Sequence, residues 1–303
     1  MHAVEICEVT KTFGRHTAVN GLSLAVPQGT IYGFIGPNGS GKTTTLRMVM
    51  RILHPDRGMI RVLGETSRDA VDDRIGYLPE ERGLYKKMKV AEVLAFYGAL
   101  KRCPNVRAEV AGWLDRMGLG DWADKKVETL SKGMAQKVQF IAAVVARPSL
   151  VILDEPFSGL DPINAEVLKN EVLNLRRDGA TVIFSTHDMA VAEKMCDAIF
   201  MIFRGRKVLD GTLDDIQSRY GEDTLRVRID GNGDALRDLP GVERVNDYGR
   251  FQELRMNAGV DPQQILVSLA GRTRVHHFEV ARPSLHDVFV RIAGPEAMEA
   301  PRA

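Results

Sequence analysis

The sequence predicts an α/β fold from three features. Two short apolar runs, 150–153 and 181–184, are rich in β-branched residues and bounded by polar turns, as is typical of strands buried in a parallel sheet. Apolar residues recur at helical spacing over 90–100 and 106–117. A third apolar strand, 31–35, runs directly into a glycine-rich loop. Buried strands that alternate with helices favour a parallel sheet covered by helices.

Further elements are expected at both ends of the chain. Residues 4–9 and 22–26 have strand patterns, and a turn at 27–29 separates them from the 31–35 strand. Near residue 220 the pattern restarts as a small α+β module. Three elements are expected in that module: strands at 225–229 and 275–280, and a helix over 285–292. We therefore predict two domains, 1–219 and 220–303.

Composition excludes several classes of protein. The 303 residues are 44% hydrophobic and 27% charged, which excludes collagen-like, low-complexity and largely disordered chains. The 41 Lys and Arg residues nearly balance the 40 Asp and Glu residues, so no nucleic-acid partner is expected. The three cysteines lie far apart and have no metal-ligand spacing, which indicates reduced thiols in a cytosolic chain. We also expect neither a standard secretion signal nor a membrane-spanning segment.

A phosphate-binding loop of the Walker A type follows the 31–35 strand. Its residues fit G-x-x-x-x-G-K-[ST], with a buried strand before it and an apolar-periodic helix, 44–52, after it. Glycines allow backbone N–H groups to surround phosphate oxygens, Lys42 reaches the terminal phosphates, and the Thr43 hydroxyl can bind Mg²⁺. The loop therefore predicts a nucleoside triphosphate ligand. Taken alone, it leaves a GTPase, a kinase and an ATPase open, and a strand-to-helix turn that needs glycine for geometry is the structural alternative.

Polar side chains follow the two other buried strands. Asp154 and Glu155 end the 150–153 strand, at the edge of the sheet where α/β proteins bind ligands. Asp154 would orient Mg²⁺, while Glu155 would face the γ-phosphate and act as general base toward the attacking water. His187 follows the 181–184 strand, and this position makes it a candidate for a γ-phosphate contact. The alternative is that both acids simply leave the strand into solvent.

These segments together resemble the nucleotide-binding subunit of ATP-binding cassette (ABC) transporters. The phosphate loop, Leu-Ser-Lys-Gly-Met at 130–134, Asp-Glu-Pro at 154–156, Ser-Gly-Leu-Asp at 158–161 and His187 occur in that family's order. The resemblance covers residues 2–219. It implies a P-loop NTPase of the ABC ATPase type, with a RecA-like parallel-sheet core, an antiparallel β subdomain and a helical subdomain at about 86–147. It also implies ATP and Mg²⁺ as cofactors.

The resemblance assigns roles to individual residues. In this family Phe13 would stack on adenine, Ser131 and Gly133 would complete the γ-phosphate site of a second chain, and Asp161 would bridge the two chains. For Phe13 the alternative is ordinary core packing, and for Asp161 it is a turn acid before proline. The expected catalytic residues are Lys42, Glu155 and His187, and the expected metal-binding residues are Thr43, Glu80 and Asp154. The expected ATP-binding residues are Phe13, Gly36, Pro37, Asn38, Gly39, Ser40, Gly41, Lys42, Thr43, Thr44, Ser131, Gly133 and Asp161.

Three positions depart from the family pattern. Glu80 stands where the family commonly has the glutamine that senses Mg²⁺ and couples to the membrane subunit. A carboxylate is a harder Mg²⁺ ligand than an amide, and it adds negative charge near the triphosphate. In the 130–134 segment, Lys132 replaces a glycine and Met134 replaces a glutamine. These changes bear on coupling and on the rate of hydrolysis.

Two further segments are similar to an exporter branch of the family. They are 76–85, and Phe278 with 283–289, which resemble ATPase subunits that carry a small C-terminal accessory domain, including sodium-efflux-type ATPases. The resemblance implies an ATP-hydrolysing exporter subunit that forms a homodimer or pairs with another ATPase subunit. It would work with a separate integral membrane permease. The expected location is cytoplasmic, peripheral on the inner face of the cell membrane.

Two other functions share part of this set of motifs. A soluble ABC-type ATPase that acts on ribosomes, nucleic acid or protein complexes would share the same motifs. The chain has one cassette, no long heptad segment and no basic tail, which count against it. A GTPase or small-molecule kinase would share only the phosphate loop. It would not explain residues 130–134, and the chain has no Asn-Lys-x-Asp motif.

Overall fold

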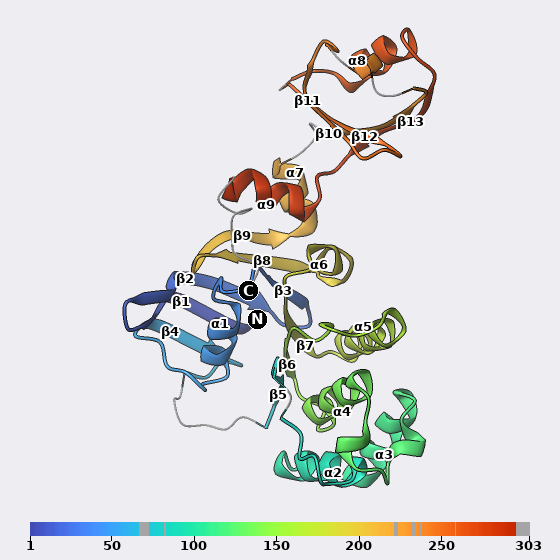
Figure 1. Cartoon of the computed structure of the whole chain (residues 1–303). Helices are drawn as coiled ribbons and strands as arrows, with labels where there is room; N and C mark the ends of the chain where they lie inside the picture. Colours follow the sequence, from blue (N-terminus) through green and yellow to red (C-terminus); the bar gives the residue numbers. More distant parts are fainter. Residues whose placement is uncertain are drawn as a thin grey trace. The chain divides into compact units, whose positions relative to one another are not determined.

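The computed structural model describes residues 1–66, 73–81, 83–220, 224–231, 234–236, 238–257 and 259–294. The chain divides into two compact units, Met1–Leu213 and Asp214–Ala303 (Figure 1). The expected boundary at 219/220 falls at the far end of helix α7 (Leu213–Tyr220), which groups with the second unit. The reason is local: Gln217 Nε2 donates to the carbonyl of Pro283 at 3.2 Å, and Arg282 pairs with Asp214.

The first unit contains two sheets. The three-stranded sheet is antiparallel and has the order β2-β1-β4. The larger sheet has the order β5-β6-β7-β3-β8-β9 and is parallel except for the β8–β9 pair. The strands are β1 (His2–Phe13), β2 (His16–Pro27), β3 (Ile31–Ile35), β4 (Arg57–Val62), β5 (Ile75–Leu78), β6 (Leu150–Asp154), β7 (Thr181–Thr186), β8 (Ala198–Phe203) and β9 (Arg206–Thr212).

The strand order brings three loops to one edge of the larger sheet. Strand β7 lies between β3 and β6, and all three are buried at every position, as apolar strands covered by helices should be. Their carboxyl ends are in register: Ile35 pairs with Thr186, and Asp154 pairs with Ser185. The loops that follow these strands therefore begin side by side.

Helices cover the larger sheet and connect its strands. Helix α1 contacts β2, β4 and β6, so it lies between the two sheets (Figure 1). The helix expected over 44–52 begins at Lys42 and ends at Val49, because Arg51 adopts a left-handed backbone with φ 60° that an α-helix cannot continue. The helices of this unit are α1 (Lys42–Val49), α2 (Val90–Leu100), α3 (Val106–Arg116), α4 (Lys132–Val144), α5 (Pro162–Arg177) and α6 (Met189–Met195).

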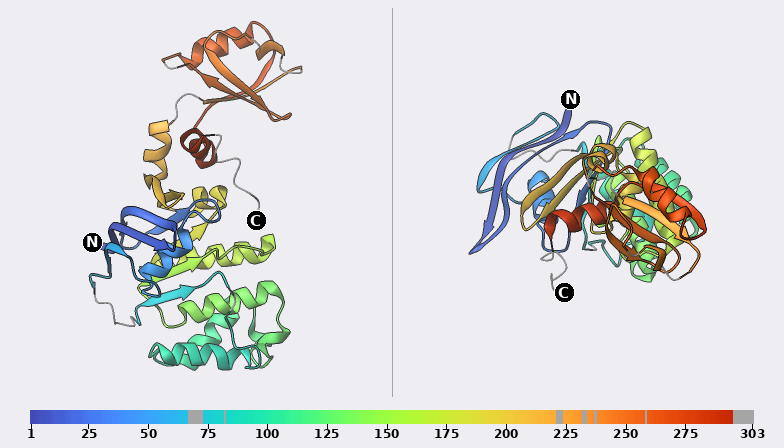
Figure 2. Two further views of the ribbon diagram at one scale, coloured as in Figure 1. Left: turned by 60° about the vertical axis from the view of Figure 1, so that its left-hand side comes forward. Right: turned by 90° about the horizontal axis from the view of Figure 1, so that it is seen from above.

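Helices α2, α3 and α4 form a helical part with its own hydrophobic packing. Trp113 packs edge-on against Phe140 and is buried with Leu94 and Val110. Two 3₁₀ turns, Gly120–Trp122 and Val127–Thr129, lead into α4. In the view from above, this part and the antiparallel sheet lie on opposite sides of the larger sheet (Figure 2). The helices predicted at 90–100 and 106–117 are confirmed.

The second unit is an α+β module. Its sheet is antiparallel throughout, with the order β11-β12-β10-β13. One face packs on α8 through alternating residues such as Leu225, Val227 and Leu254, which is the pattern expected for a half-buried strand. The elements are β10 (Thr224–Ile229), a 3₁₀ turn (Asp234–Leu236), β11 (Val242–Asp247), β12 (Gln252–Met256), α8 (Pro262–Ala270), β13 (Val275–Ala281) and α9 (Leu285–Ala293).

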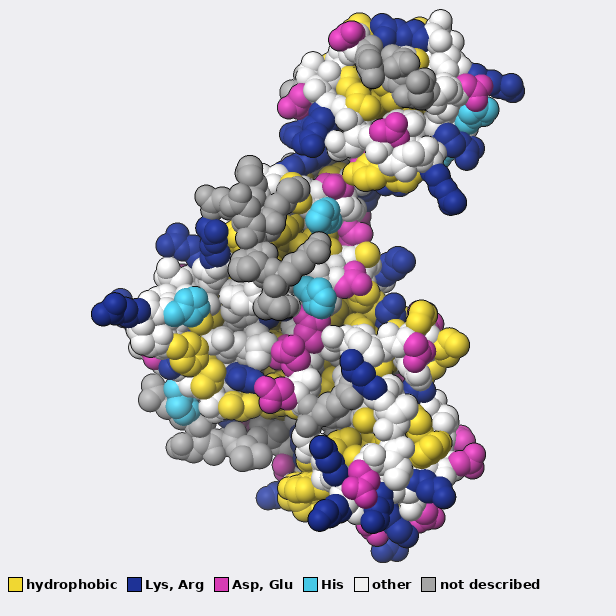
Figure 3. Space-filling view, in the orientation of Figure 1, with side chains coloured by type: hydrophobic (Ala, Val, Ile, Leu, Met, Phe, Trp, Pro, Cys, Tyr) yellow, Lys and Arg dark blue, Asp and Glu magenta, His cyan; other side chains and the backbone are white. Residues whose placement is uncertain are grey.

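The surface carries charges of both signs. On the face drawn in Figure 3, Lys and Arg side chains are interspersed with Asp and Glu, in line with the formal net charge of +1. Among the described residues, no helix has the length and apolar character needed to cross a membrane. Residue 82 of the 76–85 segment lies outside the described residues, as do 221–223, 232, 233, 237, 258 and 295–303 of the predicted C-terminal domain.

Candidate functional site

The phosphate loop, residues 36–43, connects β3 to α1 at the edge where β3, β6 and β7 end. A Cβ atom on Gly36 would lie 2.2 Å from the carbonyl oxygen of Ile202. At Gly41, where φ is 110°, it would lie 2.5 Å from the carbonyl oxygen of Ala18. Both contacts are with backbone, so only glycine fits at either position. The glycines therefore serve the geometry of the turn, which brings the start of α1 to the sheet edge.

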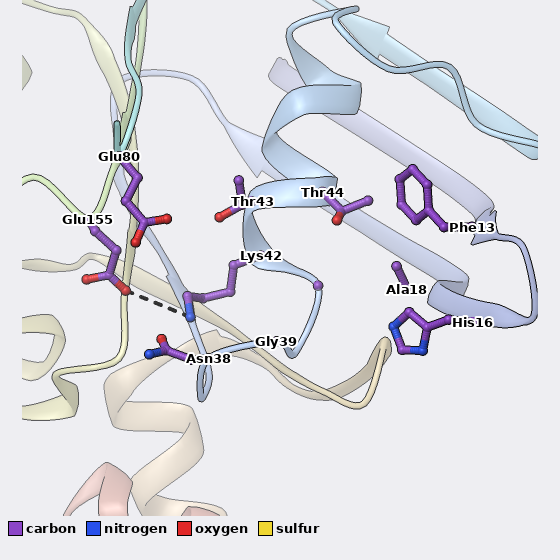
Figure 4. A pocket seen from close by; sticks show the side chains of 11 residues that line it. Phe13, His16, Ala18, Asn38, Gly39, Lys42, Thr43, Thr44, Glu80 and Glu155 are labelled. Carbon is purple, nitrogen blue, oxygen red and sulfur yellow. Dashed lines mark ion pairs between the residues drawn. The ribbon is translucent and has the colours of Figure 1, made fainter. Parts of the chain in front are cut away.

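Lys42 is the first residue of α1, and its side chain folds back over the loop. The Nζ atom donates to the carbonyls of Gly36 at 2.7 Å and Pro37 at 3.2 Å, and the side chain is only 6% exposed. It also lies 3.8 Å from Oε1 of Glu155, as the dashed line in Figure 4 marks. Burial lowers the pKa of Lys42, while Glu155 and Asp154 act in the opposite direction. The loop thus holds a cation next to the acids of β6.

A cavity of about 450 Å³ opens along this loop, which is a usual size for a small-molecule site. Glu80 and Glu155 lie at one end of it, and Phe13 lies at the other (Figure 4). Phe13 is 47% exposed, so its alternative as a core residue is wrong. The lining residues are Phe13, His16, Ala18, Asn38, Gly39, Gly41, Lys42, Thr43, Thr44, Glu80 and Glu155.

Asp154 ends β6 and is fully buried. Its Oδ1 accepts hydrogen bonds from the hydroxyls of Thr43, at 3.3 Å, and Ser185. Its Oδ2 is also buried, yet it has no hydrogen-bond partner among the described residues. Carboxylate and hydroxyl oxygens are ligands that Mg²⁺ prefers, directly or through its bound water. A buried carboxylate with one unpaired oxygen beside a threonine hydroxyl therefore fits a Mg²⁺ ion.

Glu155 sits in a left-handed backbone conformation, with φ 49°. Its N–H donates to Ser185 Oγ at 3.0 Å, and its Oε1 lies 3.0 Å from Nδ1 of His187. A proton on Nδ1 would allow His187 to donate to this carboxylate. A non-glycine residue in this backbone region stores strain, and such residues gather at functional sites. The two acids of β6 thus point to different neighbours, as the sequence predicts, and Glu155 does not leave the strand into open solvent.

Ser185 is a site residue that the sequence analysis missed. Its hydroxyl donates to Asp154 Oδ1 and accepts from the N–H of Glu155, so one atom orients both acids. The side chain is fully buried in β7. The available signal was a pair of hydroxyl residues, Ser185 and Thr186, at the end of an otherwise apolar strand that leads to the same sheet edge.

The signature segment, residues 130–134, lies away from this cavity. Ser131 is the N-cap of α4 and accepts from the N–H of Met134 at 3.3 Å. A Cβ on Gly133 would lie 3.0 Å from Nδ2 of Asn164, so Gly133 packs closely on α5. Asp161 caps α5, and hydrogen bonds from Asn164 lower its pKa. Asp161 thus caps α5 directly before Pro162, and its role as a bridge between two chains stays a prediction. Neither Ser131, Gly133 nor Asp161 lines the cavity described above.

Comparison with known proteins identifies the class. Residues 19–158 match the family model described as ABC transporter, and 211–293 match the model for the C-terminal domain of ATP-binding proteins similar to DrrA1-3. The chain resembles a solved structure titled "Structure of ATP binding subunit of ABC transporter", with a TM-score of 0.66 and 29% identity. That likeness covers 72% of this chain and 93% of the other.

Two relatives from bacteria extend the match over nearly the whole chain. The uncharacterized ABC transporter ATP-binding protein YhaQ of Bacillus subtilis is 40% identical over 95% of this chain and 98% of its own length. The Nod factor export ATP-binding protein I of Ralstonia nicotianae is 34% identical over 94% and 92%. The chain belongs to the ABC transporter ATP-binding proteins. ATP binding and the P-loop ABC ATPase fold follow from that membership, and it implies ATPase activity.

Proposed function

We propose that the chain is the ATP-hydrolysing subunit of an ABC exporter, forming an ATP-sandwiched dimer that drives a separate membrane permease. The observation that carries the hydrolytic part is the contact of Glu155, which lines the cavity that continues to Phe13, with both Lys42 and His187. A carboxylate, a cation and an aromatic ring would then lie along the nucleotide. The three groups suit the reacting phosphate, its charge and the adenine, respectively.

The residues of the phosphate loop and those at the end of β6 would have different roles in hydrolysis. The N–H groups of 36–44 would surround the phosphates, and Lys42 would exchange its contacts with loop carbonyls for contacts with phosphate oxygens. Thr43, Asp154 and Glu80 would hold Mg²⁺, which supplies positive charge to the phosphates when bound. Glu155 would accept the proton of the attacking water, and His187 would hold the Glu155 carboxylate and reach the γ-phosphate.

The second half of each site would come from another copy or from a paired ATPase subunit. Ser131 and Gly133 stand at the N-terminus of α4, where backbone N–H groups favour an anion, but they lie away from their own chain's cavity. Two chains arranged head to tail would bring each signature segment onto the other's ATP. Asp161, at the start of α5, would then bridge the two chains.

The transport part of the proposal draws on the relatives. One relative's name states Nod factor export, and the C-terminal module matches that of the proteins similar to DrrA1-3. An exporter subunit of this kind would be cytoplasmic, on the inner face of the membrane, and attached through its permease. No nucleic-acid partner is expected, given the near-zero net charge.

A pull-down from native membranes tests this function. A tagged copy is extracted in mild detergent, and the proteins that co-purify with it are identified by mass spectrometry. We expect one multi-span membrane protein at near-equal stoichiometry, and ATPase activity that a Glu155→Gln variant lacks. If the chain instead brings down ribosomes or nucleic acid, the soluble ABC-type ATPase replaces the exporter. If it prefers GTP to ATP, the ATPase assignment fails.

A further inference from the structure

Helix α4 carries two buried glutamines one turn apart. Gln136 and Gln139 are 5% and 6% exposed, although glutamine is ordinarily a surface residue. Both side chains use their amide N–H groups to reach backbone carbonyls of segments that follow strands of the larger sheet. The amide N–H groups thereby keep hydrogen bonds in place of those with water, whereas Oε1 of Gln139 is buried without a partner among the described residues.

Gln139 holds the two residues that flank Glu80. Its Nε2 donates to the carbonyl of Pro79 at 3.3 Å and to the carbonyl of Glu81 at 3.1 Å. Two carbonyl acceptors fix the orientation of the amide, because only the NH₂ group can donate to both. The 79–81 segment, which we term the Glu80 loop, is thereby tied at both ends to one side chain of α4.

The Glu80 side chain leaves this loop toward the phosphate site. It lines the cavity, and in Figure 4 its carboxylate lies beside Glu155 and faces Lys42 and Thr43. The negative charge of Glu80 also acts to raise the pKa of Lys42. Glu80 lies beside another carboxylate, that of Glu155, and like charges repel, so its position depends on the backbone that carries it.

Gln136 makes the equivalent contact with the other side of the site. Its Nε2 donates to the carbonyl of Pro156 at 3.1 Å, directly after Glu155. The two glutamines thus have different hydrogen-bond acceptors. Gln139 holds the loop of the proposed metal ligand, and Gln136 holds the residue after the proposed base. This difference makes Gln136 a matched control for Gln139.

We propose that Gln139 is a positioning residue that sets the Glu80 carboxylate for the nucleotide-bound Mg²⁺. The inference rests on the proposed function in one respect, namely that Glu80 meets the metal. Glutamine is required at 139 because a glutamate there would set carboxylate oxygens against two carbonyl oxygens, and a leucine would leave both carbonyls without their donor.

The test measures metal dependence rather than activity alone. Binding of the non-hydrolysable analogue AMP-PNP is followed by calorimetry, with Mg²⁺ and with EDTA, and the Mg²⁺ concentration that half-saturates ATPase activity is measured in parallel. For Gln139→Leu we expect the half-saturating Mg²⁺ concentration to rise by about 10-fold, the lower end of the effect of outer-shell residues on metal affinity. Binding of AMP-PNP in EDTA should stay within about 2-fold of the wild type.

A double-variant cycle shows whether Gln139 acts through Glu80. Glu80→Ala alone should raise the half-saturating Mg²⁺ concentration, and adding Gln139→Leu to it should raise it no further. Gln136→Leu, the matched control, should lower turnover and leave the Mg²⁺ requirement within about 2-fold. Gln139→Met, which keeps an unbranched side chain of similar length, replaces Gln139→Leu if that variant unfolds.

Several outcomes overturn the inference. They are an unchanged Mg²⁺ requirement in a folded Gln139 variant, the same shift in Gln136→Leu, or a Gln139 effect that persists in full without Glu80. Failure of the proposed function is a different result: the wild-type chain would hydrolyse no ATP. The calorimetric comparison of Mg²⁺ with EDTA would still test Gln139 in that case.

Discussion

Two loop-to-helix junctions of the first unit, at the N-termini of α1 and α4, are built alike but have different surroundings. In each, a loop turns into the N-terminus of a helix, where backbone N–H groups favour an anion. At α1 the N-cap is Gly41, no side chain caps the helix, and Lys42 is buried. At α4 the N-cap is Ser131, whose hydroxyl accepts from the N–H of Met134, and the next residue, Lys132, is exposed.

The difference lies in the surroundings of each junction. The α1 junction lines a cavity that also holds a cation and two acids, with His187 beside one of those acids. The α4 junction is capped by its own serine and does not line that cavity. The α1 junction therefore suits a ligand of its own chain, and in the proposed dimer the α4 junction would serve the site of another chain.

The largest expected effect concerns Glu155, the proposed base, which lies beside the α1 junction. Glu155→Gln keeps the shape of the side chain and removes its ability to take a proton, so turnover should fall by about 10²- to 10⁴-fold. Nucleotide binding should be retained, because the phosphate loop is untouched. Steady-state ATPase assays and calorimetry with ATP measure the two quantities. Normal turnover in this variant would show that Glu155 is not the base.

The next effect concerns the turn that forms the α1 junction. Gly41→Ala places a Cβ 2.5 Å from the carbonyl oxygen of Ala18 at a φ of 110°, and we expect the free energy of unfolding to fall by about 3 kcal/mol.

Gly39→Ala is the matched control, because φ there is 75° and no atom lies within 4 Å of the added Cβ. For this variant the free energy of unfolding should fall by about 1 kcal/mol, because only the left-handed backbone is unfavourable for alanine. Urea unfolding of both variants measures the two free energies. Equal losses of unfolding free energy would show that the contact with the Ala18 carbonyl adds no destabilisation.

A smaller effect is expected for the cation. Lys42→Met removes the ammonium and keeps most of the apolar stem, so the ATP dissociation constant should rise by about 10- to 100-fold, the value of one charged hydrogen bond. Thermal unfolding monitors the fold in parallel. An unchanged dissociation constant would mean that Lys42 serves only to hold the carbonyls of Gly36 and Pro37.

The smallest effect separates the two junctions most directly. Ser131→Ala removes the cap of α4, which should cost about 1 kcal/mol of stability. ATP binding by a single chain should not change, whereas turnover at high protein concentration should fall, because in the proposed dimer the missing hydroxyl would belong to a partner's site. If single-chain binding weakens as well, the signature segment contacts its own nucleotide and the dimer proposal loses its basis.

The sequence predicts the elements and site residues whose positions follow from a local pattern. The buried strands, the helices at 90–100 and 106–117, and the phosphate loop could be predicted because apolar periodicity and glycine spacing have direct local causes. Asp154 and Glu155 could be placed at the sheet edge because they directly follow an apolar strand.

Other features could be recognised only in the three-dimensional structure. Ser185 is one hydroxyl in an apolar strand, and its role exists only because β7 pairs with β6. Gln139 looks like a polar residue in a helix until the fold buries it against the Glu80 loop. The predicted boundary, 219/220, falls within α7, because the sequence pattern does not say to which module a connecting helix belongs.

The single hydroxyl of Ser185 limits how this site can change over evolution. Its oxygen serves the buried carboxylate and the strained peptide that follows it, so one substitution touches both. Threonine keeps the oxygen and suits a buried strand, whereas alanine would orphan two polar groups at once. One hydroxyl therefore links the orientation of the proposed metal ligand to that of the proposed base, and threonine is the replacement that would keep both hydrogen bonds.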